Sequence, residues 1–206
     1  MLSEYRVGPI TSVDGGVNPG RADRQGSLAV TQGKAKFADA VSRGNMYHAA
    51  NQGGITLSVL SATATGFILT NPKGSGRNLL IYEIGALQTG TATGAANAAL
   101  QLTFGPYSEI AVVHTTALTV RNCLLGSGNI GVGLVDSAAT LPVTPVAILN
   151  LWQQSISATA SVGIPPQVLY RADGLIGVAP GCSISMSSLG TALGYATHMI
   201  WEEVPQ

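Results

Sequence analysis

Charged side chains are scarce in this chain, and their scarcity limits its function from the start. Only 10% of the 206 residues are Asp, Glu, Lys or Arg, against roughly a quarter in ordinary soluble domains. The 10 basic and 10 acidic residues cancel, so no overall field gathers nucleic acid. Aromatic residues make up only 5% of the chain and do not alternate with Lys or Arg, as they do in stacking platforms for single strands. We therefore expect no nucleic-acid partner.

The few charges are also unevenly spread along the chain. Residues 1–43 hold half of the 20 charged side chains, whereas the stretch from Ile84 to Trp201 holds five. A lone protein with so few charges and no net charge tends to associate. We therefore expect self-association to bury part of the region between residues 84 and 201, with Ser, Thr, Gly and Ala hydrating the rest.

Cysteines and long apolar segments are likewise scarce. The two cysteines, Cys123 and Cys182, stand apart from each other and from any histidine, so neither a disulfide framework nor a zinc site is indicated. We expect both to be free thiols. Residues 1–10 lack the basic segment and apolar run of a secretory signal, and no stretch of eighteen apolar residues predicts a membrane span. We expect the chain to stay in a cytoplasm, with no membrane partner, until it is assembled.

Motifs for catalysis and for cofactor binding are missing too. The pairs Gly74-x-Gly76, Gly126-x-Gly128 and Gly131-x-Gly133 are not followed by the Gly-Lys-Ser/Thr of a phosphate loop, so we interpret them as turns. No Gly-x-Ser-x-Gly motif positions a nucleophilic serine. We predict no enzymatic activity, no catalytic residues, no metal site and no cofactor.

Two acidic residues near the end of the chain deserve a separate interpretation. His198 and Glu202 are four positions apart, so on a strand they share a face, and we expect a surface pair. Glu202 and Glu203 are adjacent and therefore point to opposite faces. We interpret them as a solvated edge or as a partner contact.

What the chain does contain is a series of short strand patterns separated by turn residues, with no strong amphipathic helix. Residues 36–43 fit either a strand or one helical turn. We predict about eight to ten strands at spacings of roughly 8 to 15 residues. The candidate segments are 27–30, 46–50, 55–60, 67–70, 79–87, 100–104, 146–152, 168–170, 175–178, 183–186 and 195–204. This pattern predicts an all-β fold in a single domain over residues 27–206, either an antiparallel β-sandwich that is jelly-roll-like or a barrel.

The strand predicted over residues 79–87 stands out because its apolar run is almost unbroken. A strand that is covered on both faces has this composition. We expect one face to be covered by the second sheet of the sandwich and the other by an extra layer or a neighbouring subunit. The preceding residues, 71–76, form a turn.

Several phrases of the sequence resemble a known class of protein. They are Arg24–Leu28, Gly44–Gly54, Asn71–Leu79 and Trp201–Pro205. Together they are similar to the small β-rich structural proteins of tailed bacteriophages that decorate or cement the outside of the head. The resemblance implies a virion protein on the capsid exterior, assembled in the host cytoplasm. It also implies two partners, the major capsid protein and the chain itself as a homotrimer or homodimer.

Residues 1–26 are predicted to form an extended N-terminal arm. They contain three turn signals and too few apolar residues to fold alone. Spaced apolar and basic side chains suit contact with a neighbouring protomer or with the capsid shell. The predicted contact residues are Tyr5, Arg6, Ile10, Arg21 and Arg24.

Two other functions remain open at this point. A tail or receptor-binding appendage would also be rich in Ser, Thr and Gly, but it would be expected to have an adaptor helix or coiled-coil heptads. A carbohydrate-active enzyme on a sandwich would need two carboxylates in a cleft lined by aromatic residues. Its candidates in the middle of the chain are Glu83, Glu109, Asp136 and Asp173.

Overall fold

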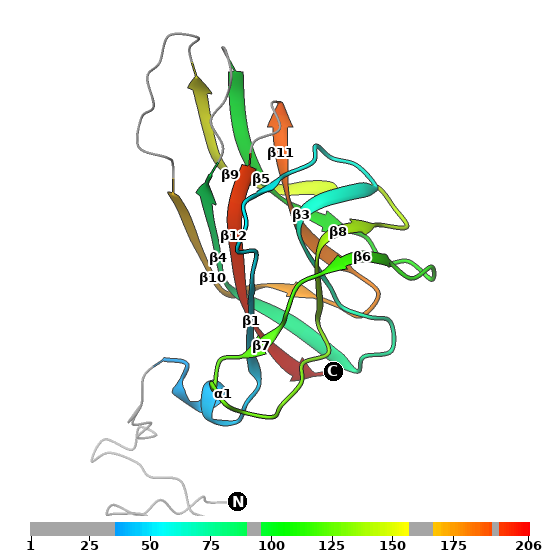
Figure 1. The fold of residues 1–206 in the computed structure, drawn as a ribbon. Coiled ribbons are helices and arrows are strands. Elements are labelled where there is room, and N and C mark those ends of the chain that lie inside the picture. Colours follow the sequence, from blue (N-terminus) through cyan, green and yellow to red (C-terminus); the bar gives the residue numbers. More distant parts are fainter. Residues whose placement is uncertain (1–35, 90–95, 157–166, 191–193) are drawn as a thin grey trace, which may run out of the picture. The chain divides into compact units, whose positions relative to one another are not determined.

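The computed structural model describes residues 36–89, 96–156, 167–190 and 194–206 (Figure 1). The chain divides into two units, Met1–Asp39 and Ala40–Gln206, and the sheets belong to the second. The predicted arm over residues 1–26, its contact residues Tyr5, Arg6, Ile10, Arg21 and Arg24, and the predicted domain boundary after residue 26 all lie outside the described residues.

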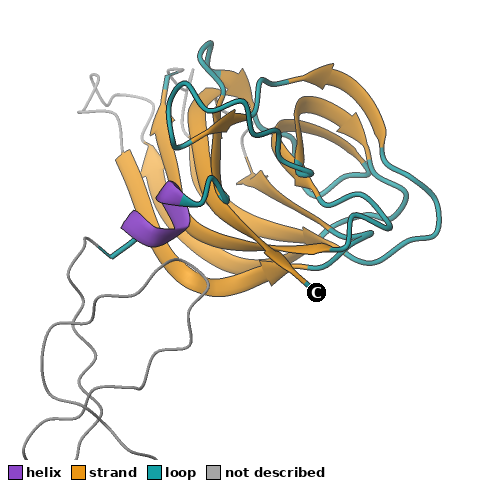
Figure 2. Cartoon of the chain, turned by 90° about the horizontal axis from the view of Figure 1, so that it is seen from below, coloured by secondary structure: helices purple, strands orange, loops and turns teal. Residues whose placement is uncertain are grey.

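The described part of the second unit forms two antiparallel sheets that pack face to face (Figure 2). The first sheet has the order β10 (Gln167–Val178), β4 (Arg77–Gln88), β12 (Gly194–Pro205), β1 (Met46–Ala50) and β7 (Arg121–Asn122), and β2 (Ile55–Thr56) also pairs with β12. The second has the order β6 (Val113–Ala117), β8 (Leu134–Thr140), β3 (Thr63–Thr70), β11 (Ser183–Gly190), β5 (Ala96–Gly105) and β9 (Val146–Ile156). The predicted all-β antiparallel sandwich is confirmed, and its jelly-roll detail stays a prediction.

The core lies between the two sheets and follows the alternation of the strands. In β12, Met199 and Trp201 are fully buried, whereas the neighbouring His198 and Ile200 face outward. The second sheet contributes Leu102 and Ile184 among its buried side chains. Burial of a large aliphatic side chain contributes about 1.5–3 kcal/mol, so this interface is the main source of stability.

A β-bulge explains the long apolar run of β4. Its register with β12 shifts between Ile81 and Glu83, which leaves Tyr82 as an extra residue. The shift reverses the alternation, so Leu79 and Ile81 before the bulge and Ile84 after it all point into the core. The run therefore needs no cover on its outer face to account for its composition.

The neighbouring strand β10 departs from prediction at the same place. Residues 168–170 and 175–178 were expected as two strands, but they belong to one strand with a register shift between Arg171 and Ile176. Asp173 and Gly174 in the shifted segment have φ values of 48° and 84°, which bend the strand outward. The strand expected over 55–60 is shorter than predicted, since β2 ends at Thr56.

The segment left open between strand and helix forms a single helical turn, α1 (Ala38–Ser42). It ends in a Schellman motif, in which the Gly44 amide donates to the Val41 carbonyl and the Asn45 amide to the Ala40 carbonyl. Gly44 has a φ of 69°, which favours glycine. Within the described ranges, no helix is both long and apolar enough to span a bilayer.

The turn between β3 and β4 is organised by one buried asparagine. The Asn71 side chain is fully buried; its amide donates to the carbonyls of Arg77 and Val178, each at 2.8 Å, and its oxygen accepts from the Ser75 hydroxyl. Its backbone carbonyl accepts from the Gly181 amide. The predicted turn over 71–76 is therefore also the point where the 179–182 turn is attached.

Candidate partner-binding surface

The exposed surface of the described residues is apolar rather than charged. Sixteen large apolar side chains are exposed: Val59, Leu60, Leu87, Tyr107, Ile110, Val113, Leu124, Leu125, Ile130, Leu134, Val143, Val146, Ile148, Leu169, Leu175 and Leu189. Eight charged residues are exposed: Lys36, Asp39, Arg43, Lys73, Glu109, Arg121, Arg171 and Asp173. Single exposed apolar residues are normal, but an excess over charge marks surfaces that contact other molecules.

The most exposed of these side chains, Ile130, lies on the connection formed by residues 123–133, here called the β7–β8 loop. Ile130 is 92% exposed and Leu125 is 78% exposed, and Leu124 is also exposed. The loop contains no Asp, Glu, Lys, Arg or His. Its tip, residues 124–130, therefore presents apolar groups to solvent and contains no charged residue of its own.

The first end of the loop is fixed by a buried asparagine. Asn122 donates from its side chain to the Gly44 carbonyl at 2.6 Å and accepts from the Leu124 amide at 2.8 Å. The next amide, that of Cys123, donates to the Met46 carbonyl at 2.8 Å. The bonds to Gly44 and Met46 connect the loop to residues that precede β1 or start it, and the Asn122–Leu124 bond fixes the first turn of the loop, so the loop begins from a rigid base.

The second end is fixed by a buried carboxylate from β12. Glu203 is 1% exposed, and its two oxygens accept the backbone amides of Val132 at 2.9 Å and Gly133 at 3.0 Å. The indole N–H of Trp201 is a third donor, at 3.3 Å. A buried carboxylate is tolerated only when such donors replace its water. The carboxylate therefore ties the end of the loop to the last strand, where Figure 1 shows the two side by side.

The interpretation of Glu203 as a solvated edge or partner contact was wrong. The two glutamates do point to opposite faces, but the inward one meets the glycine-containing turn and not solvent. A Cβ at Gly131 would lie 2.7 Å from a Glu203 oxygen, so this glycine is needed for the close approach. The Gly131-x-Gly133 turn does bind an anion, and that anion is the chain's own glutamate.

Tyr47 completes the environment of Glu203. Its ring stacks on Trp201 with centroids 6.3 Å apart. Burial raises the pKa of the Tyr47 hydroxyl, and the negative charge of Glu203 raises this pKa further. The phenol therefore stays neutral at physiological pH, and the aromatic pair closes the site on the core side.

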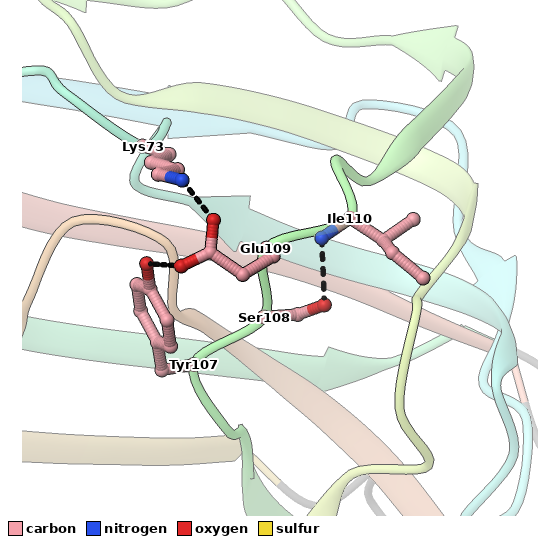
Figure 3. A network of polar contacts seen from close by, with 5 residues as sticks. All are labelled: Lys73, Tyr107, Ser108, Glu109 and Ile110. Atoms are coloured by element: carbon pink, nitrogen blue, oxygen red, sulfur yellow. Dashed lines mark hydrogen bonds and ion pairs between the residues drawn. The ribbon is translucent and has the colours of Figure 1, made fainter.

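A second exposed group lies on the connection between β5 and β6, residues 106–112, here called the strap. Glu109 accepts from the Tyr107 hydroxyl at 2.5 Å and from the Lys73 ammonium (Figure 3). Ile110, next to them, is 71% exposed, and its amide donates to the Ser108 hydroxyl at 3.0 Å. The cluster thus combines one aromatic, one aliphatic and one ion pair on the surface.

The strap is held against the outer face of the second sheet. The Ser108 amide donates to the Gly181 carbonyl at 3.2 Å. Val112 packs on a small cluster formed by Ala64, Ile68, Ala139 and Leu141. Since Ile68 lies between two residues of the main core, Phe67 and Leu69, this cluster is on the opposite face of the sheet. The strap covers part of that face.

The ion pair of the strap shifts the ionisation of its members in the expected directions. The Lys73 ammonium holds the pKa of Glu109 below its usual value, and Glu109 in turn raises the pKa of Lys73. The hydrogen bond to Glu109 also raises the pKa of Tyr107. All three groups are open to solvent, so the ion pair positions these side chains on the surface but contributes little to stability.

The outer face of the first sheet carries ionisable side chains in a different arrangement from the predicted one. Glu202 accepts from the Tyr82 hydroxyl at 2.6 Å. Burial, and then this hydrogen bond, raises the pKa of Tyr82 to about 12. His198 lies 3.5 Å from Glu83 and not against Glu202. Two features explain the exchange: the bulge brings Tyr82 to Glu202, and Gly85 leaves room for the imidazole, since a Cβ there would lie 1.9 Å from His198 Cε1.

The remaining candidate residues lie on separate elements. Asp136 is buried and pairs with His114 at 2.5 Å, whereas Glu83 faces Arg171 on the first sheet and Glu109 is on the strap. No group of three or more His, Cys, Asp or Glu able to hold a metal occurs in the described ranges. Cys123 and Cys182 are both free, and burial raises the pKa of each thiol.

The contacts that fix the ends of the β7–β8 loop were not predicted from the sequence, because most of them join residues far apart along the chain. Glu203 and Val132 are 71 residues apart, and nothing local to either predicts the pairing. The usable signal was the predicted alternation of residues 195–204, which already placed position 203 on the same face as Trp201. Comparisons of this chain with known protein families, with curated proteins and with solved structures gave no match.

Proposed function

We propose that this chain is a structural protein of a tailed-phage particle, which binds the outside of the capsid and stabilises it as a cement or decoration protein. The proposal starts from the resemblance of four sequence phrases to such proteins. One observation carries it further: on the described surface, exposed large apolar side chains outnumber exposed charged ones by sixteen to eight. A protein with this surface is suited to being covered by other proteins.

The same observation favours assembly over a freely diffusing role. Interfaces contain apolar centres surrounded by polar groups and are depleted of charge. At the tip of the β7–β8 loop, Leu125 and Ile130 supply an apolar centre, and Ser127 and Asn129 supply uncharged polar groups beside it. In this proposal the chain associates with itself, as a homotrimer or homodimer, and with the major capsid protein.

The arm supplies the second attachment in this proposal. Residues 1–26 would lie across a neighbouring protomer or the shell, using Tyr5, Arg6, Ile10, Arg21 and Arg24. Two linked contacts raise the effective affinity without any new interaction surface. Deleting residues 1–20 is therefore expected to weaken capsid occupancy tenfold or more, while the thermal unfolding of the remaining chain changes little.

Co-sedimentation with particles tests the proposal. The purified chain is mixed with heads that lack it and, separately, with tails from the same virus, and each mixture is centrifuged. Saturable binding to heads, together with a higher temperature of head disruption, is the expected result. Binding to tails alone would instead favour the appendage function, and a chain that stays in the supernatant with both would contradict the proposal.

A further inference from the structure

We propose that the tip of the β7–β8 loop is the site through which copies of this chain associate, with Leu125 and Ile130 of one copy packing on the same residues of another around a symmetry axis. The inference rests on the self-association proposed above and assigns it to named side chains. It concerns contacts between copies, and not the contact with the capsid.

Two of the three most exposed large apolar side chains lie on this loop, and the third is Leu175 on β10. Ile130, at 92%, is the most exposed of the sixteen large apolar side chains, and Leu125, at 78%, is five positions away on the same connection. Neither side chain contributes to the core. Burial on association would therefore remove most of their area from water, which is the favourable term in protein association.

The backbone of the loop is already ordered before any partner binds. Asn122 fixes its first end and Glu203 its second. Within the tip, the Ser127 amide donates to the Leu124 carbonyl and the Asn129 amide to the Ser127 hydroxyl. A pre-organised segment loses little conformational entropy on binding, so more of the contact energy appears as affinity.

The absence of charge in the loop points to a second copy as the partner. Around a symmetry axis, each side chain meets its own counterpart, so a charged residue near the axis would face a like charge. Residues 123–133 contain no Asp, Glu, Lys, Arg or His, and self-packing therefore brings no like charges together. The hydroxyl of Ser127 and the amide of Asn129 supply an uncharged polar border around the apolar centre.

The strap, in contrast to the β7–β8 loop, has charged side chains beside its exposed apolar residue. Its exposed Ile110 stands beside the charged side chains of Glu109 and Lys73. Placed on an axis, that cluster would bring two copies of each charge together. The β7–β8 loop meets the requirement of a symmetric contact with fewer conflicts than the strap does.

Charge pairs on the tip test the proposal. Ile130→Glu and Ile130→Lys are each made in the full chain, and self-association is measured by sedimentation equilibrium for each variant alone and for the equimolar mixture. We expect each variant alone to associate at least tenfold more weakly than the wild type, and the mixture to recover association because opposite charges then meet at the axis. Thermal unfolding of the dilute variants confirms that they fold.

The matched control uses Leu175, which is 83% exposed on β10. Leu175→Glu, Leu175→Lys and their mixture are expected to associate as the wild type does. A wild-type chain that is monomeric at every concentration would contradict self-association itself. A wild-type oligomer that survives both Ile130 variants, or Ile130 variants whose mixture shows no recovery, would contradict only the assignment to the loop.

A cross-link gives a second, independent readout. A Cβ at Gly128 on the tip or at Gly53 after β1 meets no atom within 4 Å, so a cysteine fits at either position. In a Cys123→Ser background, Gly128→Cys is expected to form a disulfide between copies on mild oxidation, whereas Gly53→Cys is expected to form no disulfide between copies. Equal cross-linking at the two positions would overturn the proposal.

Discussion

The base and the tip of the β7–β8 loop differ in what they contribute to the molecule. The base consists of Asn122, Val132 and Gly133 with the buried carboxylate of Glu203, and every polar group named there has a partner. At the tip, Leu125 and Ile130 face solvent and contribute nothing to the core. Neighbouring parts of one loop therefore have different roles: the base stabilises the fold, and the tip is available for association. Substitutions at the base should lower the free energy of unfolding, whereas substitutions at the tip should weaken self-association.

The largest effect is expected from removing the carboxylate at the base. Glu203→Ala leaves the amides of Val132 and Gly133 without an acceptor in a buried site. We expect a loss of about 3–5 kcal/mol in the free energy of unfolding, measured by chemical denaturation. The neighbouring variant Glu202→Ala removes a carboxylate from the outer face and should cost about 1 kcal/mol or less. Equal losses in the two variants would break the comparison.

A smaller effect is expected at the other end of the base. Asn122→Ala removes the donor to the Gly44 carbonyl and the acceptor of the Leu124 amide, which predicts a loss of about 2 kcal/mol in unfolding free energy. Asn122→Asp keeps the acceptor and removes the donor. It should also destabilise the fold, because a carboxylate then faces the Gly44 carbonyl. An Asn122→Ala chain as stable as the wild type would show that the loop is not fixed at this end.

The free energy of unfolding should depend on pH through His48 of β1, the strand next to the base of the β7–β8 loop. His48 of β1 pairs with Arg121 of β7, and burial, then the charges of His198 and Arg121, lowers the pKa of His48 below its usual 6.5. The folded chain then binds this proton less readily than the unfolded chain. The stabilising contribution of neutral His48 is present above pH 6.5 and is lost as the pH falls toward the lowered pKa.

Denaturation of the wild type and of His48→Gln at pH 8, 7, 6 and 5 measures this contribution. The buried Nε2 of His48 has no acceptor among the described residues, so protonation gains no hydrogen bond. We expect the wild type to lose more stability on acidification than His48→Gln does. Parallel curves for the two proteins would show that another group is responsible.

The smallest effect on stability is expected at the tip. Leu125→Ser and Ile130→Ser replace exposed side chains and should change the free energy of unfolding of the dilute chain by about 0.5 kcal/mol or less. The same variants should weaken self-association. A loss of stability as large as that of Asn122→Ala would mean that the tip, too, has a structural role.

Much of the fold could be predicted from the sequence because alternation is a local property. The pattern over residues 195–204 predicted that Met199 and Trp201 share one face of the strand, and both are fully buried. The prediction failed where a bulge changes the phase, as at Tyr82 in β4, since a bulge depends on how the neighbouring strands pair. Strand β8 was missed because Asp136 and Ser137 interrupt its apolar residues, although both are buried.

Less of the candidate site could be predicted. The scarcity of charge indicated association, and the glycine pairs indicated turns. The role of Glu203 depended on a contact across 71 residues, and the exposure of Leu125 and Ile130 depended on the base holding the tip away from the core. From sequence alone, an apolar residue in a turn cannot be distinguished from a core residue, because its exposure depends on the positions of the surrounding strands.

Hydrogen exchange of the backbone amides tests the central claim most directly. The full chain is measured at a concentration where it is monomeric and at one where it is associated. We predict that the amides of Val132 and Gly133 exchange slowly in both states, whereas the amides of Leu125 and Ile130 at the tip exchange quickly in the monomer and slowly in the oligomer. Unchanged exchange at the tip on association, or fast exchange at Val132 and Gly133 in the monomer, would contradict the account.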